Sequence, residues 1–167
     1  MVVRLDNGVE VVIRPIRPDD KALLLEGVAQ LSDESAYRRF LGPKHQLSLR
    51  ELRYFTEVDF ADHVALVAVR PDEPETMVGV GRWVRMPGDP QAAEVAYLVA
   101  DELQGHGLGT ALADALADAA RARGVRRFVA TMLPDNAAAR RLLAHVSDEV
   151  QTRIVNGVAQ VEGRLAA

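Results

Sequence analysis

A glycine-rich stretch decides how this chain folds: Gln104-Gly105-His106-Gly107-Leu108-Gly109-Thr110. It lies between a strand-like run, Glu94 to Ala100, and a helix-like run, Leu108 to Arg123. Glycine adopts positive φ and lets a ligand come close to the main chain. The first N–H groups of the following helix have no partner within that helix and lie at the positive end of its dipole. The stretch therefore predicts a binding site for a phosphate or diphosphate.

Two well-known phosphate-binding loops do not explain this stretch. A P-loop needs a lysine directly after its last glycine, and the only lysines of the chain are Lys21 and Lys44. A dinucleotide-binding loop needs glycine or alanine where Thr110 stands, and an acidic residue at the end of a strand about twenty residues later. The strand-like run from Phe128 to Leu133 is followed by a proline instead. The P-loop is thus excluded and the dinucleotide-binding loop is disfavoured.

A third loop matches better. The pattern Gln104-x-x-Gly107-x-Gly109 after a strand resembles the acetyl-CoA loop of the GNAT superfamily of N-acetyltransferases. Four other segments resemble parts of that family: the entry into the first helix, the fourth and fifth strands, and an asparagine-led helix. They are Arg14–Asp20, Glu94–Val99, Arg126–Leu133 and Asn136–Leu143. Because they follow the family's order over nearly the whole chain, the resemblance implies the GNAT fold.

The remaining patterns predict a single α/β domain over residues 1–167, built on one mixed, mostly antiparallel sheet flanked by helices. Asn-Gly pairs between β-branched runs predict hairpins near both ends of the chain. Two helices are expected in the first third, one opening at Asp19 and one at a capping box formed by Ser48 and Glu51. The expected turns and strands are Asn7-Gly8, His63–Val69, Met77–Arg85 and Asn156-Gly157.

The composition limits the function classes. The chain has 167 residues, enough for one core, and no cysteine, so a thiol nucleophile and a zinc–thiolate site are excluded. Its four histidines lack metal-ligand spacing, so we expect no metal. No apolar run reaches membrane-spanning length, and early charges argue against a secretory signal, so we expect a cytoplasmic protein without a membrane partner. A net charge of −4 argues against nucleic acid. A homodimer is left open.

The resemblance implies acetyl transfer from acetyl-CoA to a primary amine by direct attack. A lysine-like amine has a pKa of about 10.4, so presenting it neutral at pH 7 costs about 4.6 kcal/mol. A general base is therefore the first requirement, whereas a thiolate with a pKa of about 8.5 leaves readily. Glu94 resembles the strand-four glutamate that serves as base in several family members. We expect its carboxylate to be half-buried beside the thioester.

The usual general acid is missing. Many family members carry a tyrosine directly after the pattern N-x-x-A-x-x-L; Asn136, Ala139 and Leu142 match this pattern, but Leu143 stands at the tyrosine position. Leucine donates no proton, so either water or another residue protonates the thiolate. The open candidates are Tyr37, Tyr54 and Tyr97. Tyr97 has the opposite strand parity to Glu94, so a bulge would be needed for both to face one site.

The resemblance also implies the cofactor contacts. Main-chain amides from Gln104 to Thr110 would bind the diphosphate: Gln104, Gly105, His106, Gly107, Leu108, Gly109 and Thr110. An amide near Leu98 or Val99 would stabilise the oxyanion, and the same edge would pair with the pantetheine amides. Asn136 would cap its helix and contact the pantetheine arm. For Arg140 and Arg141 two interpretations stay open: contact with the 3′-phosphate of the adenosine, or simple solvation on the helix surface.

The sequence identifies the acceptor substrate less well than it identifies the cofactor. Arg14 to Asp20, Leu31 to Ser35 and Tyr37 to Phe40 look similar to the start of bacterial protein-lysine acetyltransferase domains. This suggests a protein lysine, with a small primary amine or amino acid as the alternative. Because the tyrosine is missing, a non-catalytic acyl-CoA-binding module of the same fold remains the rival function.

Overall fold

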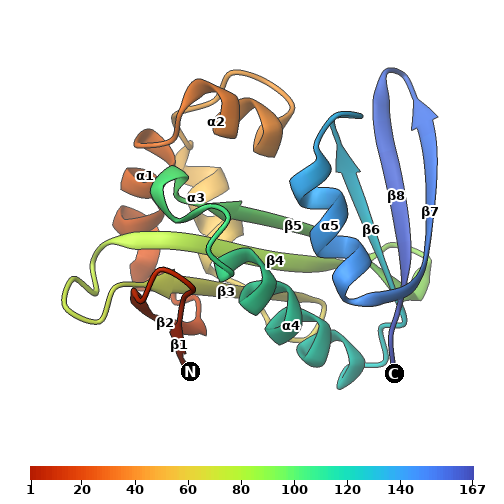
Figure 1. Ribbon diagram of the computed structural model, residues 1–167, viewed down its shortest axis with the longest axis horizontal. Helices are drawn as coiled ribbons and strands as arrows, with labels where there is room; N and C mark the ends of the chain where they lie inside the picture. Colours follow the sequence, from red (N-terminus) through yellow and green to blue (C-terminus); the bar gives the residue numbers. More distant parts are fainter.

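The computed structural model describes all 167 residues as one eight-stranded sheet in the order β1-β2-β3-β4-β5-β6-β8-β7. Neighbouring strands are antiparallel except β5 and β6, which are parallel. The strands are β1 (Val2–Arg4), β2 (Glu10–Pro15), β3 (His63–Val69), β4 (Met77–Met86), β5 (Asp89–Val99), β6 (Arg127–Met132), β7 (Ser147–Val155) and β8 (Val158–Leu165). The helices are α1 (Lys21–Ala29), α2 (Asp33–Phe40), α3 (Leu49–Thr56), α4 (Leu108–Arg121) and α5 (Ala137–His145). The predicted mixed, mostly antiparallel sheet is confirmed (Figure 1).

Local sequence signals explain the turns and helix starts. Asn156 and Gly157 both have positive φ, 52° and 79°, and close the β7–β8 hairpin as expected of an Asn-Gly pair. The capping box is also confirmed. Ser48 Oγ accepts a hydrogen bond from the Glu51 N–H at 3.2 Å, and Glu51 Oε2 accepts one from the Ser48 N–H at 2.9 Å.

Helices cover both faces of the sheet. On one face, α4 buries Leu108, Leu112 and Leu116 completely, and Leu116 belongs to the same core cluster as Trp83 and Phe128. On the other face, α1 and α3 pack apolar residues that include Leu24, Val28 and Leu52 against Val67, Val80 and Leu98. Burying each such side chain contributes roughly 1.5–3 kcal/mol relative to exposure. Ala113, Ala117 and Ala120 of α4 are also buried, whereas Ala115 and Ala119 are only partly buried.

The sheet divides where β5 and β6 meet. These two strands pair only over Ala92 to Glu94, opposite Arg127 to Val129. Beyond Glu94 they diverge: in Figure 1 the strands β3, β4 and β5 run across the view, whereas β6, β8 and β7 run upward. The edge of β5 from Val95 to Val99 therefore has a partner only in β4. This opening is the place where the fold can receive a ligand as an added strand.

The expected number of helices in the first third was wrong. The sequence predicted two helices before β3, but α2 forms a third, because Ser32 Oγ accepts a hydrogen bond from the Ser35 N–H at 3.1 Å and acidic residues follow in the first turn. α1 ends at Ala29, so Leu31 lies after it. β5 begins at Asp89. None of the helices combines the length and the apolar character needed to span a bilayer.

Candidate active site

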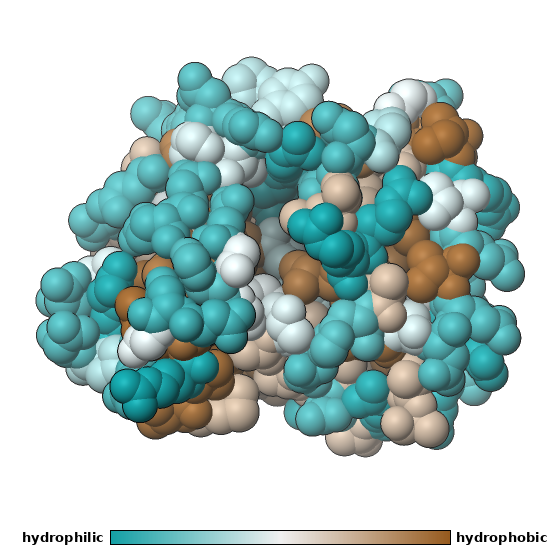
Figure 2. Space-filling model, in the orientation of Figure 1, coloured by the Kyte–Doolittle hydropathy of each residue, from teal (hydrophilic) through white to brown (hydrophobic).

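A cleft of about 540 Å³ opens where β5 and β6 separate. Its walls come from β5, β6, the glycine-rich stretch, α2 and α5. Figure 2 shows a hollow on this face, between the surface on the α2 side and the surface over α5. A cleft of this size lies in the range used for small-molecule and cofactor binding.

The glycine-rich stretch presents a row of free donors to the cleft. No main-chain N–H from Gly105 to Thr110 donates a hydrogen bond to the protein, and no side chain caps the start of α4. Gly105 and Gly107 have φ values of 78° and 92°, where a side chain would be strained. Gly109 serves a different purpose, because a Cβ there would lie 3.2 Å from Leu142 of α5. Two glycines thus shape the loop, and the third lets α4 and α5 pack closely.

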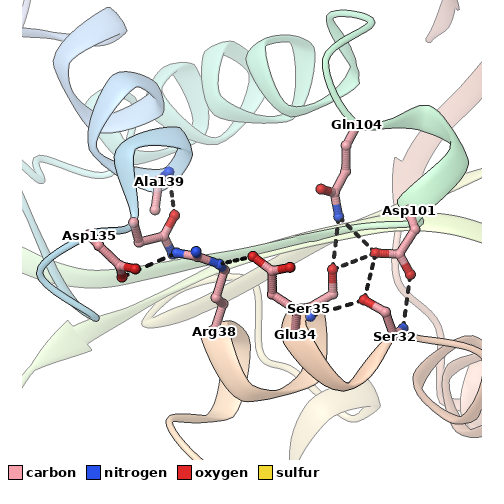
Figure 3. Close-up of polar contacts among 9 residues, drawn as sticks. Ser32, Glu34, Ser35, Arg38, Asp101, Gln104, Asp135 and Ala139 are labelled. Carbon is pink, nitrogen blue, oxygen red and sulfur yellow. Dashed lines mark hydrogen bonds and ion pairs between the residues drawn. The ribbon is translucent and has the colours of Figure 1, made fainter.

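A polar network fixes this loop to α2 (Figure 3). Gln104 Nε2 donates to Ser35 Oγ, to the Val99 carbonyl and to Asp101 Oδ1, at 3.1, 3.1 and 3.3 Å. Asp101 also accepts hydrogen bonds from the Ser32 N–H at 2.9 Å, Ser32 Oγ at 3.0 Å and Ser35 Oγ at 2.5 Å. Partial burial opposes the charged form of Asp101, but the hydrogen bonds from Ser35 and Ser32 outweigh it and hold the pKa of its carboxyl below the usual value. The sequence analysis missed this network because its members lie up to 69 residues apart.

The main chain of β5 decides which amides face the opening. The Ala100 N–H donates to the Val78 carbonyl of β4 at 2.9 Å. The register between β4 and β5 is regular from Val99 back to Ala93. Because main-chain groups alternate along a strand, Leu98 directs its N–H toward β4, whereas Tyr97 and Val99 direct theirs toward the cleft. Of the two amides considered from the sequence, Val99 has the better direction for an oxyanion, while Leu98 contributes its side chain.

Glu94 lies at the point where β5 and β6 part. Its side chain is exposed, so the expected half-burial was wrong. The carboxylate makes no hydrogen bond or ion pair within the protein, and its side chain is not part of the cleft wall formed by its neighbours Val95 and Ala96. It shares a face of the strand with Ala96 and Leu98, so a substrate entering along that face meets it at the rim.

The three tyrosines differ in their relation to the cleft. Tyr37 and Tyr54 are 45% and 53% exposed and do not line it, whereas Tyr97 does. Tyr97 faces α4, on the opposite side of β5 from Glu94, because no bulge interrupts the strand between them. Its hydroxyl is buried without a hydrogen-bond partner, and burial raises the pKa of that hydroxyl far above its usual value. A group with so high a pKa is a weak proton donor to a thiolate. Leu143, at the tyrosine position, is completely buried.

The start of α5 supplies polar groups to the opposite wall. Asn136 is buried and lines the cleft; its Oδ1 accepts from the Ala139 N–H at 3.1 Å, so its amide NH₂ remains free to donate. Arg140 instead donates to Thr152 Oγ1 and the Pro134 carbonyl, at 3.3 and 3.2 Å. Arg141 lines the cleft, whereas Arg140 and His106 do not. Of the two arginines, Arg141 is therefore better placed for a phosphate.

Two further arginines on the α1–α3 side escaped the sequence analysis. Arg82 of β4 is only 5% exposed, and Arg39 of α2 borders the cleft. No carboxylate lies within 4.0 Å of either guanidinium. The sequence pattern contained little to identify this pair, because a single arginine in an apolar strand does not reveal which residue lies opposite it.

Comparisons with known proteins agree with this geometry. The family described as the Acetyltransferase (GNAT) domain matches residues 10–146. The chain belongs to the GNAT family of acetyltransferases. Acetyltransferase Pat of Mycolicibacterium smegmatis is 36% identical over 145 residues, which is 84% of this chain and 42% of Pat, so the chain spans less than half of that relative.

Two further GNAT relatives match over more of their own length. Acetyltransferase PA5475 of Pseudomonas aeruginosa is 32% identical over 142 residues, covering 84% of this chain and 76% of that protein. The solved GNAT domain of S. lividans PAT is 34% identical with a TM-score of 0.87, and the match covers 99% of this chain and 96% of that domain. The predicted family and fold are thereby confirmed.

Proposed function

We propose that this GNAT domain transfers an acetyl group from acetyl-CoA to a primary amine by direct attack, with Glu94 as the general base. The observation that carries the proposal is the row of unpaired N–H groups from Gly105 to Thr110 beside the open edge of β5. Buried or half-buried main-chain donors without a protein partner are rare, so a site that keeps several of them free is built for an acceptor-rich ligand.

The cofactor would bind along one continuous line. The amides from Gly105 to Thr110 would hold the diphosphate at the start of α4, whereas the Gln104 N–H, also expected there, donates to the Asp101 carbonyl at 3.3 Å. The pantetheine arm runs beside β5 as an extra strand and pairs with main-chain groups that have no partner in β6. Asn136 donates its amide NH₂ to the arm from the opposite wall. This line brings the thioester to the part of β5 near Val99, whose N–H stabilises the tetrahedral oxyanion.

Glu94 would remove the proton from the amine. It lies on the same strand as the oxyanion donor, on the face that carries Ala96 and Leu98. Its exposure puts the carboxylate in contact with water, so one ordered water relays the proton where the amine does not reach Glu94 directly. The thiolate leaves without a dedicated acid, because a thiol pKa of about 8.5 makes it a good leaving group and neither Leu143 nor Tyr97 is a suitable donor.

The acceptor is a primary amine, and we propose a protein lysine as the first class to test. The similarity of the N-terminal segments to bacterial protein-lysine acetyltransferase domains supports it. The cleft opens beside α2, whose exposed residues offer a surface for a protein chain. A small primary amine is the alternative within the same chemistry.

The direct test measures thiol release with acetyl-CoA, lysine-containing proteins and small amines for the wild type and Glu94→Gln. We expect the variant to bind acetyl-CoA as tightly as the wild type. Its turnover should fall by at least about 100-fold. Glu149→Gln is the matched control, because Glu149 is an exposed strand glutamate on β7, away from the cleft. Unchanged turnover in Glu94→Gln would remove Glu94 from the mechanism.

A non-catalytic acyl-CoA-binding module is the second candidate. Two observations favour it: Leu143 replaces the usual tyrosine, and Glu94 does not line the cleft. Under this alternative, acetyl-CoA binds with normal affinity but no amine, peptide or protein in the panel releases thiol above the rate in buffer. Thiol release that depends on an added amine excludes it.

A further inference from the structure

The side chain of Arg39 has no polar partner, although it lies at the inner end of the cleft. It makes no hydrogen bond and no ion pair within the protein; its guanidinium instead makes a cation–π contact with Phe40, with Cζ 5.0 Å from the centroid of the ring. Burial lowers the pKa of Arg39, and the negative charge of Glu94 offsets part of that shift. Arg39 is therefore a partly desolvated cation that is free to change its contacts.

Arg82 lies behind Arg39 and is held in place. Its Nη1 donates to the Phe55 carbonyl and contacts His63 Nε2, both at 3.1 Å, and its Cζ lies 4.4 Å from the centroid of the Phe55 ring. Arg39 and Arg82 both line a small inner cavity of about 10 Å³, together with Leu98. Burial, together with the positive charge of Arg39, lowers the pKa of Arg82 to about 9. The two guanidiniums thus repel each other across an apolar space.

The strand register places Glu94 on the same face of the sheet as Arg82. Arg82 of β4 stands opposite Ala96 of β5, so Arg82, Ala96 and Glu94 share one face of the sheet, with Glu94 at the diagonal position. Arg39 reaches the same face from α2, where it borders both the cleft next to Ala96 and the inner cavity next to Leu98. Arg39 therefore shares a small cavity with one fixed positive charge, Arg82, and lies within the electrostatic influence of an unpaired carboxylate, Glu94.

We propose that Arg39 is a positioning residue that orients the carboxylate of Glu94 for proton removal, with Arg82 as the fixed charge that directs Arg39 toward it. The inference rests on the proposed function, since it takes Glu94 as the base. An exposed carboxylate samples several rotamers, and a guanidinium fork restricts it to the one in which an oxygen faces the amine. Because Arg82 blocks the inner position by repulsion, Glu94 is the partner with which Arg39 gains most.

A double-mutant cycle tests this inference. The variants are Arg39→Gln, Glu94→Gln and their combination, assayed by thiol release, with acetyl-CoA affinity measured by calorimetry. We expect Arg39→Gln to lower kcat by about 10-fold or more, to leave the affinity for acetyl-CoA within about 2-fold, and to have no further effect once Glu94 is replaced. Arg39→Lys should recover part of kcat, since it keeps the charge without the fork.

Arg38→Gln is the matched control. Arg38 is the next residue of α2 and also lines the cleft, but its guanidinium is already paired with Glu34 and Asp135, at 3.0 and 3.4 Å (Figure 3). Its effect should be the same with and without Glu94. Equal losses from Arg39→Gln in both backgrounds, or a loss only in acetyl-CoA affinity, would overturn the positioning role. Full activity of Glu94→Gln alone would instead overturn the base assignment, and the positioning role with it.

Discussion

The two ends of the cleft are built in different ways. At the cofactor end, backbone geometry and a dense polar network hold the glycine-rich stretch in place through Asp101, Gln104, Ser32 and Ser35. At the acceptor end, Glu94 and Arg39 carry opposite charges and yet have no hydrogen-bond or ion-pair partner. Under the proposed function, the difference predicts that the cofactor site is preorganised, whereas Glu94 and Arg39 would be brought together when an acceptor enters.

Among variants that test this difference between the two ends, a substitution of Gly107 should have the largest effect. A φ of 92° disfavours any side chain, so Gly107→Val should distort the start of α4 and weaken acetyl-CoA binding by about 100-fold. Gly88→Val is the control, because Gly88 has a similar φ of 78°, no atoms near its missing Cβ, and no place in the cleft. Both variants are titrated with acetyl-CoA by calorimetry. Because both carry a strained residue but only Gly107 lies in the cleft, the difference in affinity reports on binding rather than on strain. Equal affinities in the two variants would contradict a preformed loop.

The next largest effect is expected from breaking the polar network that joins α2 to the glycine-rich stretch. Asp101→Ala removes the acceptor of three hydrogen bonds from Ser32 and Ser35, and because Asp101 is mostly exposed we expect a loss of about 1 kcal/mol in the free energy of unfolding. The affinity for acetyl-CoA should fall several-fold as the loop loosens. Asp148 is an exposed aspartate without a hydrogen-bond or ion-pair partner, so Asp148→Ala should change neither quantity.

The pH dependence of Asp101 follows from the same contacts. Its pKa is held below the usual 3.8, so its contribution to stability is complete above that pH and disappears as the pH falls through the lowered value. Urea unfolding of the wild type and Asp101→Ala between pH 3 and pH 6 should therefore converge at the acidic end. If plots of the free energy of unfolding against pH stay parallel for the two proteins over that range, the polar network does not stabilise the charged carboxylate.

A smaller effect, on stability alone, is expected from His63 behind the acceptor end. Burial and the adjacent guanidinium of Arg82 lower the pKa of His63 from 6.5 to about 4. The unfolded chain then binds a proton that the folded chain does not, so the free energy of unfolding decreases as the pH falls from 6.5 to about 4. His63→Gln should flatten this part of the pH profile in urea unfolding, and an unchanged slope would exclude His63 as its source.

The smallest effect is expected for Tyr97. Its hydroxyl has no partner and burial raises its pKa, so it is a poor acid for the departing thiolate. Tyr97→Phe should keep turnover within about 3-fold of the wild type, because the thiolate leaves without help. A fall of about 100-fold in kcat would instead give Tyr97 the role of general acid and make both faces of β5 catalytic.

The sequence predicted best what depends on neighbouring residues. The strand before the loop, the start of α4, the Asn156-Gly157 turn and the capping box at Ser48 all follow from backbone preferences of a few adjacent residues, and the structure confirms them. The glycine pattern also indicated a ligand site, although Gly109 turned out to serve helix packing against Leu142.

What the sequence did not predict depends on contacts between distant segments. Ser32 reaches Asp101 across 69 residues, and Arg39 meets Arg82 only because α2 folds over β4 and β5. The exposure of Glu94 was missed for the same reason, since strand parity tells which face a side chain takes but not whether a helix covers that face. The direction of the Val99 amide became clear only from its register with β4.

One calorimetric comparison tests the central claim most directly. Purified protein is titrated with acetyl-CoA and, separately, with S-acetylpantetheine, which keeps the thioester and both amides but lacks the diphosphate and the nucleotide. Free N–H groups from Gly105 to Thr110 predict that acetyl-CoA binds at least about 100-fold more tightly, since two charge-assisted hydrogen bonds account for that difference. Equal affinity for the two compounds, or no heat with either, would contradict the account.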